Sequence, residues 1–87
     1  MIQVDRLDER TFQVTVEGPP RTTHRVTVDP ADYERLSDGR VPPETLVERS
    51  FEFLLEREPN TSILNRFELP VIGRYFPEYE NEIRGRL

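Results

Sequence analysis

The chain has 87 residues, the length of one domain with a single hydrophobic core and no deep internal cavity. Cysteine is absent, which excludes disulfides and thiolate zinc sites, and all 12 basic residues are arginines. The formal charge of −5 disfavours nucleic acid and anionic membranes as partners, because both attract a basic surface. No signal-type segment opens the chain and no run of 18 apolar residues occurs, so we expect a cytoplasmic protein that does not span a membrane.

Residues 1–29 are predicted to form a small antiparallel sheet of two or three strands. Apolar and polar residues alternate over 11–17 and again over 25–28, the pattern of a sheet with one buried face. The turn sequence Gly18-Pro19-Pro20-Arg21 between them predicts a hairpin. A weaker alternation at the N-terminus adds a strand that would make a three-stranded meander.

Two helices are predicted in the middle of the chain. Asp29-Pro30 is typical of a helix start, and Gly39 of the left-handed residue that follows a helix end. Pro42-Pro43 opens the main helix, which should run to about Glu58. Its apolar residues cover an arc of about 200°, whereas a helix lying on one surface needs about 100°. The main helix should therefore be buried on two sides.

Short helices are predicted after the main helix. Ile63, Leu64 and Phe67 fit one helical turn, and Pro70 can open another. Pro77 should interrupt the helix, which then resumes to about residue 86. We therefore expect one α+β domain over 1–87, with a β-hairpin or meander over 1–29 and a helical part over 30–87.

No catalytic, cofactor-binding or metal-binding residue is predicted. The only histidine, His24, is in phase with the apolar residues of its strand and should pack at the strand end rather than act as a base. Ser50 lies on the apolar face of the main helix, where a small side chain allows close packing. The acidic residues are dispersed, and there is no glycine-rich phosphate loop.

Residues 23–58 carry the order strand, short helix, turn, helix. This order resembles the ribbon-helix-helix family of DNA-binding regulators and antitoxins, in which strands from two subunits enter the major groove. The resemblance implies that Thr23, Arg25 and Thr27 would contact bases. The acidic middle segment and the extra strand before residue 23 depart from that family.

A second resemblance covers roughly residues 44–83. The residues Ser62-Ile63-Leu64, Phe67, Leu69-Pro70-Val71-Ile72 and Arg74-Tyr75-Phe76-Pro77-Glu78-Tyr79 are similar to a C-terminal signature of short, uncharacterised bacterial proteins of this length. That resemblance implies no activity.

The sequence favours a non-enzymatic interaction module that associates with protein, in the first place with itself as a homodimer. The warrant is the excess apolar surface of the main helix and the aromatic stripe after it, because a large exposed apolar patch is unusual in a monomer. A DNA-binding regulator is the alternative. The residues expected at the protein interface are Phe53, Leu55, Ile72, Tyr75, Phe76 and Tyr79.

Overall fold

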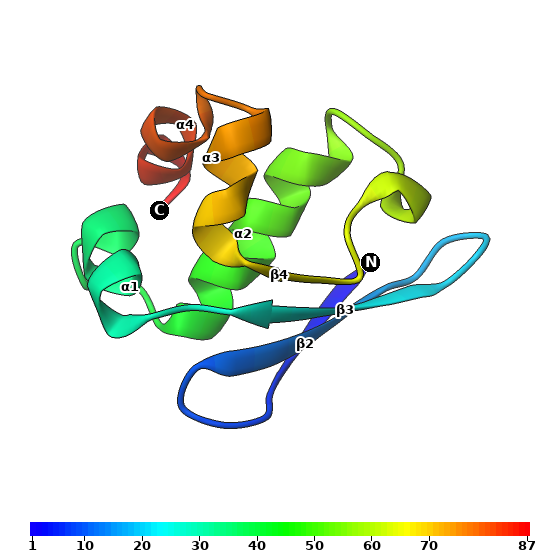
Figure 1. The fold of residues 1–87 in the computed structure, drawn as a ribbon, viewed down its shortest axis with the longest axis horizontal. Helices are drawn as coiled ribbons and strands as arrows, with labels where there is room; N and C mark the ends of the chain where they lie inside the picture. Colours follow the sequence, from blue (N-terminus) through cyan, green and yellow to red (C-terminus); the bar gives the residue numbers. More distant parts are fainter.

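The computed structural model describes all 87 residues, which fold as an α+β domain of two layers, a sheet and a set of helices on one of its faces (Figure 1). The elements, in chain order, are β1 (Ile2–Arg6), β2 (Thr11–Val16), β3 (Thr22–Thr27), α1 (Pro30–Ser37), α2 (Pro43–Leu55), η1 (Asn60–Ser62), β4 (Arg66–Glu68), η2 (Leu69–Val71), α3 (Ile72–Tyr75) and α4 (Tyr79–Arg86).

The first three strands form an antiparallel meander, which is the three-stranded form of the predicted sheet of two or three strands. In β1 and β2, Val4 lies opposite Val14, and in β2 and β3, Val14 lies opposite His24. The tight turn between β1 and β2 is closed by Asp8, whose Oδ1 accepts hydrogen bonds from the backbone N–H of Arg10 (2.9 Å) and Thr11 (2.8 Å). These donors stabilise the carboxylate and lower the pKa of Asp8.

The prediction for residues 63–67 was wrong, because this segment contains a strand and not a helical turn. A 3-10 turn at Asn60–Ser62 comes first, and β4 then pairs with β3 in the parallel sense, which gives a four-stranded sheet of order β1-β2-β3-β4. Phe67 points into the core, whereas its neighbours Arg66 and Glu68 are exposed. This is the alternation of a strand, but three residues are too few for the sequence pattern to show it.

The helix starts at Pro30 and Pro43 are as predicted, although α2 ends at Leu55, three residues earlier than expected. After α1 the backbone is left-handed at Asp38 (φ 55°) and Gly39 (φ 69°). The side chain of Asp29 does not cap α1, because its Oδ1 pairs with Arg10 Nη1 at 3.1 Å.

The core lies between the sheet and α2. Phe12, Val14 and Val26 project from the sheet and are fully buried, and α2 lies against them with Val47 and Phe51. No buried side-chain nitrogen or oxygen lacks a hydrogen-bond partner. The helices thus cover one face of the sheet, while the other face has no covering element (Figure 1).

The second apolar side of α2 is covered by the C-terminal helices. Phe53 on α2 contacts the rings of Phe76 and Tyr79, with centroid distances of 6.0 and 5.3 Å. Ser50 Oγ donates to the carbonyl of Leu46 (2.8 Å), so it accepts the hydroxyl of Tyr79 at 2.6 Å. The wide apolar arc of α2 is therefore filled within one chain.

Ion pairs fasten α4 to the helices beside it. The contacts are Arg57 with Glu78 (3.0 Å) and Glu82 (2.8 Å), Arg86 with Glu56 (2.6 Å), and Arg35 with Glu80 (3.1 Å). The guanidinium of Arg57 also lies 3.6 Å from the centroid of the Phe53 ring. Exposed ion pairs contribute at most about 1 kcal/mol each. We therefore take them to orient α4, while burial of its tyrosine and isoleucine holds it in place.

The Tyr79→Phe substitution should lower the free energy of unfolding by about 1 kcal/mol, because it removes a buried hydrogen bond. Chemical denaturation measures this loss. Tyr75→Phe is the matched control. Tyr75 is 66% exposed, so removal of its hydroxyl should leave the free energy of unfolding unchanged. Equal stability of the two variants would contradict the placement of α4.

Stability should also fall at alkaline pH. Burial raises the pKa of Tyr79, so the folded state keeps this phenol neutral where the unfolded state ionises it, above about pH 10. The contribution of the neutral Tyr79 phenol to the free energy of unfolding is complete below about pH 10. It is lost as the pH rises through the pKa that Tyr79 has in the folded state. Denaturation midpoints measured between pH 8 and 11 should therefore decline less for Tyr79→Phe than for the parent chain; parallel declines would contradict this.

Candidate functional site

The structure places three of the six predicted interface residues in the core. Phe53 and Tyr79 have no exposed surface and Ile72 is 2% exposed, so none of them can contact a partner. The prediction failed for these three because the C-terminal helices fold back onto α2. An apolar stripe along a helix has the same sequence pattern whether it meets its own chain or another.

The other three predicted interface residues reach the surface. Tyr75 is largely exposed, and Phe76 and Leu55 are partly buried. Tyr75 and Phe76 meet Leu64, which is 47% exposed, around a small hollow between the end of α2, the segment before β4, and α3. Leu64 lies outside any helix, contrary to the predicted helical turn, and its exposure is not evident from the sequence pattern.

This hollow is apolar and small. Eight of its nine lining residues are hydrophobic, and Phe67 of β4 forms part of the wall. Its volume is about 30 Å³, far below the roughly 300–1,000 Å³ of small-molecule sites. The hollow can therefore take one apolar side chain from a partner but has no room for a cofactor.

The uncovered face of the sheet is entirely polar. It carries the three residues considered for DNA contact, of which Thr23 and Arg25 are exposed and Thr27 is partly buried. The full set on this face is Gln3, Asp5, Thr11, Gln13, Thr15, Thr23, Arg25, Thr27, Arg66 and Glu68. None of them is aromatic, so the face offers no platform for stacking bases.

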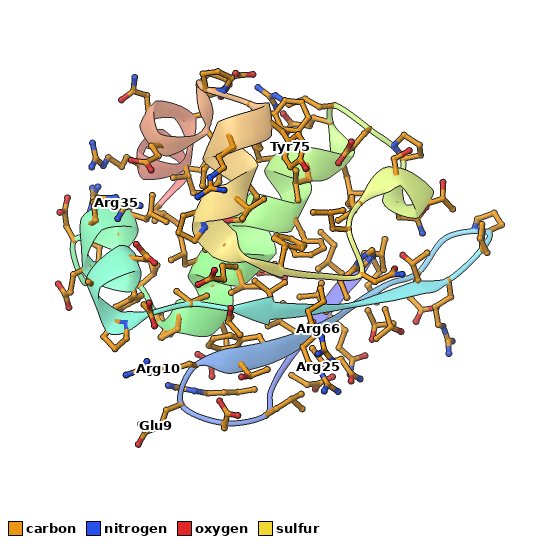
Figure 2. All side chains as sticks on the ribbon, viewed as in Figure 1. Glu9, Arg10, Arg25, Arg35, Arg66 and Tyr75 are labelled. Atoms are coloured by element: carbon orange, nitrogen blue, oxygen red, sulfur yellow. The ribbon has the colours of Figure 1, made fainter.

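Two arginines lie side by side on this face. Arg25 of β3 is the cross-strand neighbour of Arg66 of β4, and Figure 2 shows both on the side of the sheet away from the helices. Neither makes an ion pair or a side-chain hydrogen bond, although nine of the other arginines make at least one. Like charges directly opposite one another destabilise a sheet. An acidic group beside this pair would therefore reduce the repulsion between the two guanidinium groups.

His24 is buried in the middle of β3 rather than at a strand end, with 1% of its surface exposed. Its Nδ1 lies 2.8 Å from the carbonyl of Leu64, which can only accept, so Nδ1 carries the proton. Its Nε2 then accepts from the hydroxyl of Thr22 at 2.9 Å, and that oxygen in turn accepts from Asn60 at 3.0 Å. Both ring nitrogens are engaged, which leaves none to act as a base.

The hydrogen bonds of His24 position the candidate surface. His24 ties Leu64 to β3, the hydroxyl of Thr22 accepts from the side chain of Asn60, and the backbone N–H of Arg25 donates to the carbonyl of Asn65 at 2.8 Å. The segment that enters β4 is thus held at both its start and its end. This fixes Leu64 at the rim of the hollow.

Other kinds of site have less support. No three histidine, aspartate or glutamate side chains lie close enough to hold a metal ion, and Ser50, engaged with Leu46 and Tyr79, is fully buried. A wider polar hollow beside the β1–β2 turn is lined by Glu9, Arg10 and neighbouring acids, but it is open to solvent. No helix is long and apolar enough to cross a membrane.

Comparison of the chain with protein-family models, with curated proteins and with solved structures finds no match.

His24→Leu should lower the free energy of unfolding by about 1–3 kcal/mol, because the carbonyl of Leu64 and the hydroxyl of Thr22 lose their buried partner. Amide exchange should quicken at Phe67, whose strand the histidine positions. Denaturation and hydrogen exchange measure the two effects. Thr23→Val is the control on the exposed face of the same strand and should change stability by less than about 0.5 kcal/mol; a His24→Leu protein as stable as this control would contradict the argument.

Proposed function

We propose that this chain is a non-enzymatic protein-docking module that associates with a second copy of itself. The surface it uses is the docking patch, defined as Leu64, Val71, Tyr75 and Phe76 around the small hollow. The observation that carries the proposal is the convergence on this one hollow of two of the chain's four exposed large hydrophobic residues, Leu64 and Tyr75.

The chemistry of the docking patch fits a protein partner. Tyrosine combines an apolar ring with a polar tip and is enriched in protein interfaces. Seven of the nine residues that line the hollow come from residues 62–80, on which the resemblance to short bacterial proteins rests. Of these seven, Leu64 and Tyr75 are exposed, so the signature also reaches the surface at this hollow.

A second copy is favoured as the partner by the distribution of charge. Residues 61–87 contain four arginines and four acidic residues, so this segment is neutral although the chain has a net charge of −5. Two docking patches can meet without a large local repulsion, and the remaining charges are screened beyond about 8–10 Å at physiological salt.

The alternative of a DNA-binding regulator has less support. In the ribbon-helix-helix arrangement the reading strand pairs with its copy in a second subunit, but β3 already has β2 on one side and β4 on the other. The uncovered face has two arginines, Arg25 and Arg66, and two acids, Asp5 and Glu68, so its charges cancel. A neutral face gives little attraction for a phosphate backbone.

Sedimentation equilibrium at micromolar concentration tests self-association. The parent chain should show a weight-average mass that rises above 10.3 kDa with concentration. Leu64→Ser should shift the association to at least about tenfold higher concentration, because it removes apolar area from the docking patch. Leu7→Ser is the matched control, since Leu7 is also 47% exposed but lies in the β1–β2 turn. A mass of one chain at every concentration would refute the proposal.

A further inference from the structure

β4 is the last strand of the sheet and pairs with β3 on one side only. The carbonyl of Asn65 accepts from β3, and backbone groups alternate sides along a strand, so those of Phe67 also point toward β3. The N–H and C=O of Arg66 and the N–H of Glu68 point away from it. An edge of this kind is a template for another strand.

The three residues of β4 are complementary to themselves. When Arg66-Phe67-Glu68 pairs with a second copy in the antiparallel sense about Phe67, Arg66 lies opposite Glu68 of the partner subunit, and the reverse holds by symmetry. The two residues that would exchange backbone hydrogen bonds in this register are the two whose N–H groups are directed outward. Opposite charges in directly opposed positions stabilise such a pair.

We infer that the protein dimerises by antiparallel pairing of β4 with β4 of a second copy, with Arg66 and Glu68 as the determinants of register and partner. This inference rests on the self-association proposed above and specifies its geometry. The two sheets then form one continuous sheet of eight strands, and two copies of the charge pair lie on its polar face.

The unpaired arginines support this register. Arg25 and Arg66 lie next to each other and neither makes an ion pair within the chain, although Glu68 lies on the same face of the sheet, two residues further along β4. Pairing of the strands brings Glu68 of the partner subunit beside Arg66. Its carboxylate then offsets the repulsion between Arg66 and Arg25 at the β4 edge.

The docking patch lies on the other side of the same edge. The exposed Leu64 lies two residues before β4 and Val71 lies three residues after it, and both line the hollow. One strand pair thus engages main-chain groups, charges and apolar side chains together. A three-residue strand alone would be too short for a stable pair.

Charge exchange tests the pairing. In sedimentation equilibrium, Arg66→Glu and Glu68→Arg should each weaken homodimerisation by about tenfold or more, since each places like charges opposite one another twice. An equimolar mixture of the two variants should associate as tightly as the parent chain, as should the double variant R66E/E68R. Thermal melts check folding at concentrations where the parent chain is a monomer; there Arg66→Glu should leave the melting temperature unchanged or raised, because Arg25 then has an acidic neighbour.

A disulfide provides an independent test, because the chain has no cysteine of its own. Directly opposed residues of a hydrogen-bonded antiparallel pair have Cα atoms about 5.5 Å apart, within the range of a disulfide. A mixture of Arg66→Cys and Glu68→Cys should therefore oxidise to a mixed dimer in preference to either homodimer. Thr15→Cys mixed with Glu68→Cys is the control and should not cross-link above background.

The outcomes separate the two proposals. A parent chain that remains a monomer refutes self-association and the strand pairing together. A dimer that is lost with Leu64→Ser but is unaffected by both single charge changes leaves the docking patch in place and refutes the pairing of β4. Recovery in the charge mixture together with the mixed disulfide supports it.

Discussion

The two-sided apolar surface of α2 is the constraint on which the rest of the fold depends. One side is satisfied by the sheet through Phe51, and the other needs a second cover, which the chain supplies from its own C-terminus. Phe53 and Tyr79 fill that side, and the hydroxyl of Tyr79 finds its acceptor on Ser50. Between α2 and the C-terminal helices the chain returns to the sheet. That return creates β4 and the hollow beside it.

His24 sets where the returning segment meets the sheet. Its ring replaces what would be an aliphatic side chain in the core face of β3, and its two hydrogen bonds reach Leu64 and Thr22. A buried polar group of this kind is tolerated only when it is fully satisfied, and then it specifies one arrangement over others. The parallel pairing of β4 is only three residues long, so a fixed entry point is needed to select its register.

Local pattern was enough to predict the hairpin of β2 and β3, because both strands alternate over several residues, whereas the weaker alternation of β1 left a sheet of two strands open beside one of three. The helix starts were predicted because Pro30 and Pro43 mark them. Local pattern could not predict β4, where a single inward residue, Phe67, is compatible with strand or helix. Burial of the aromatic stripe could not be predicted from the sequence either, because the same apolar pattern arises whether the stripe packs against its own chain or against a partner. The neighbouring Arg25 and Arg66 are 41 positions apart, and only the fold brings them together. The candidate site therefore came from long-range contacts, which local periodicity does not encode.

The charges of β4 restrict the ways in which this edge strand can pair with a copy of itself. β4 carries one charge of each sign, and such a strand repels a parallel or shifted copy while accepting an antiparallel one centred on Phe67. The charges would thus act on specificity more than on affinity, which must come from the apolar surface around Leu64 and Tyr75.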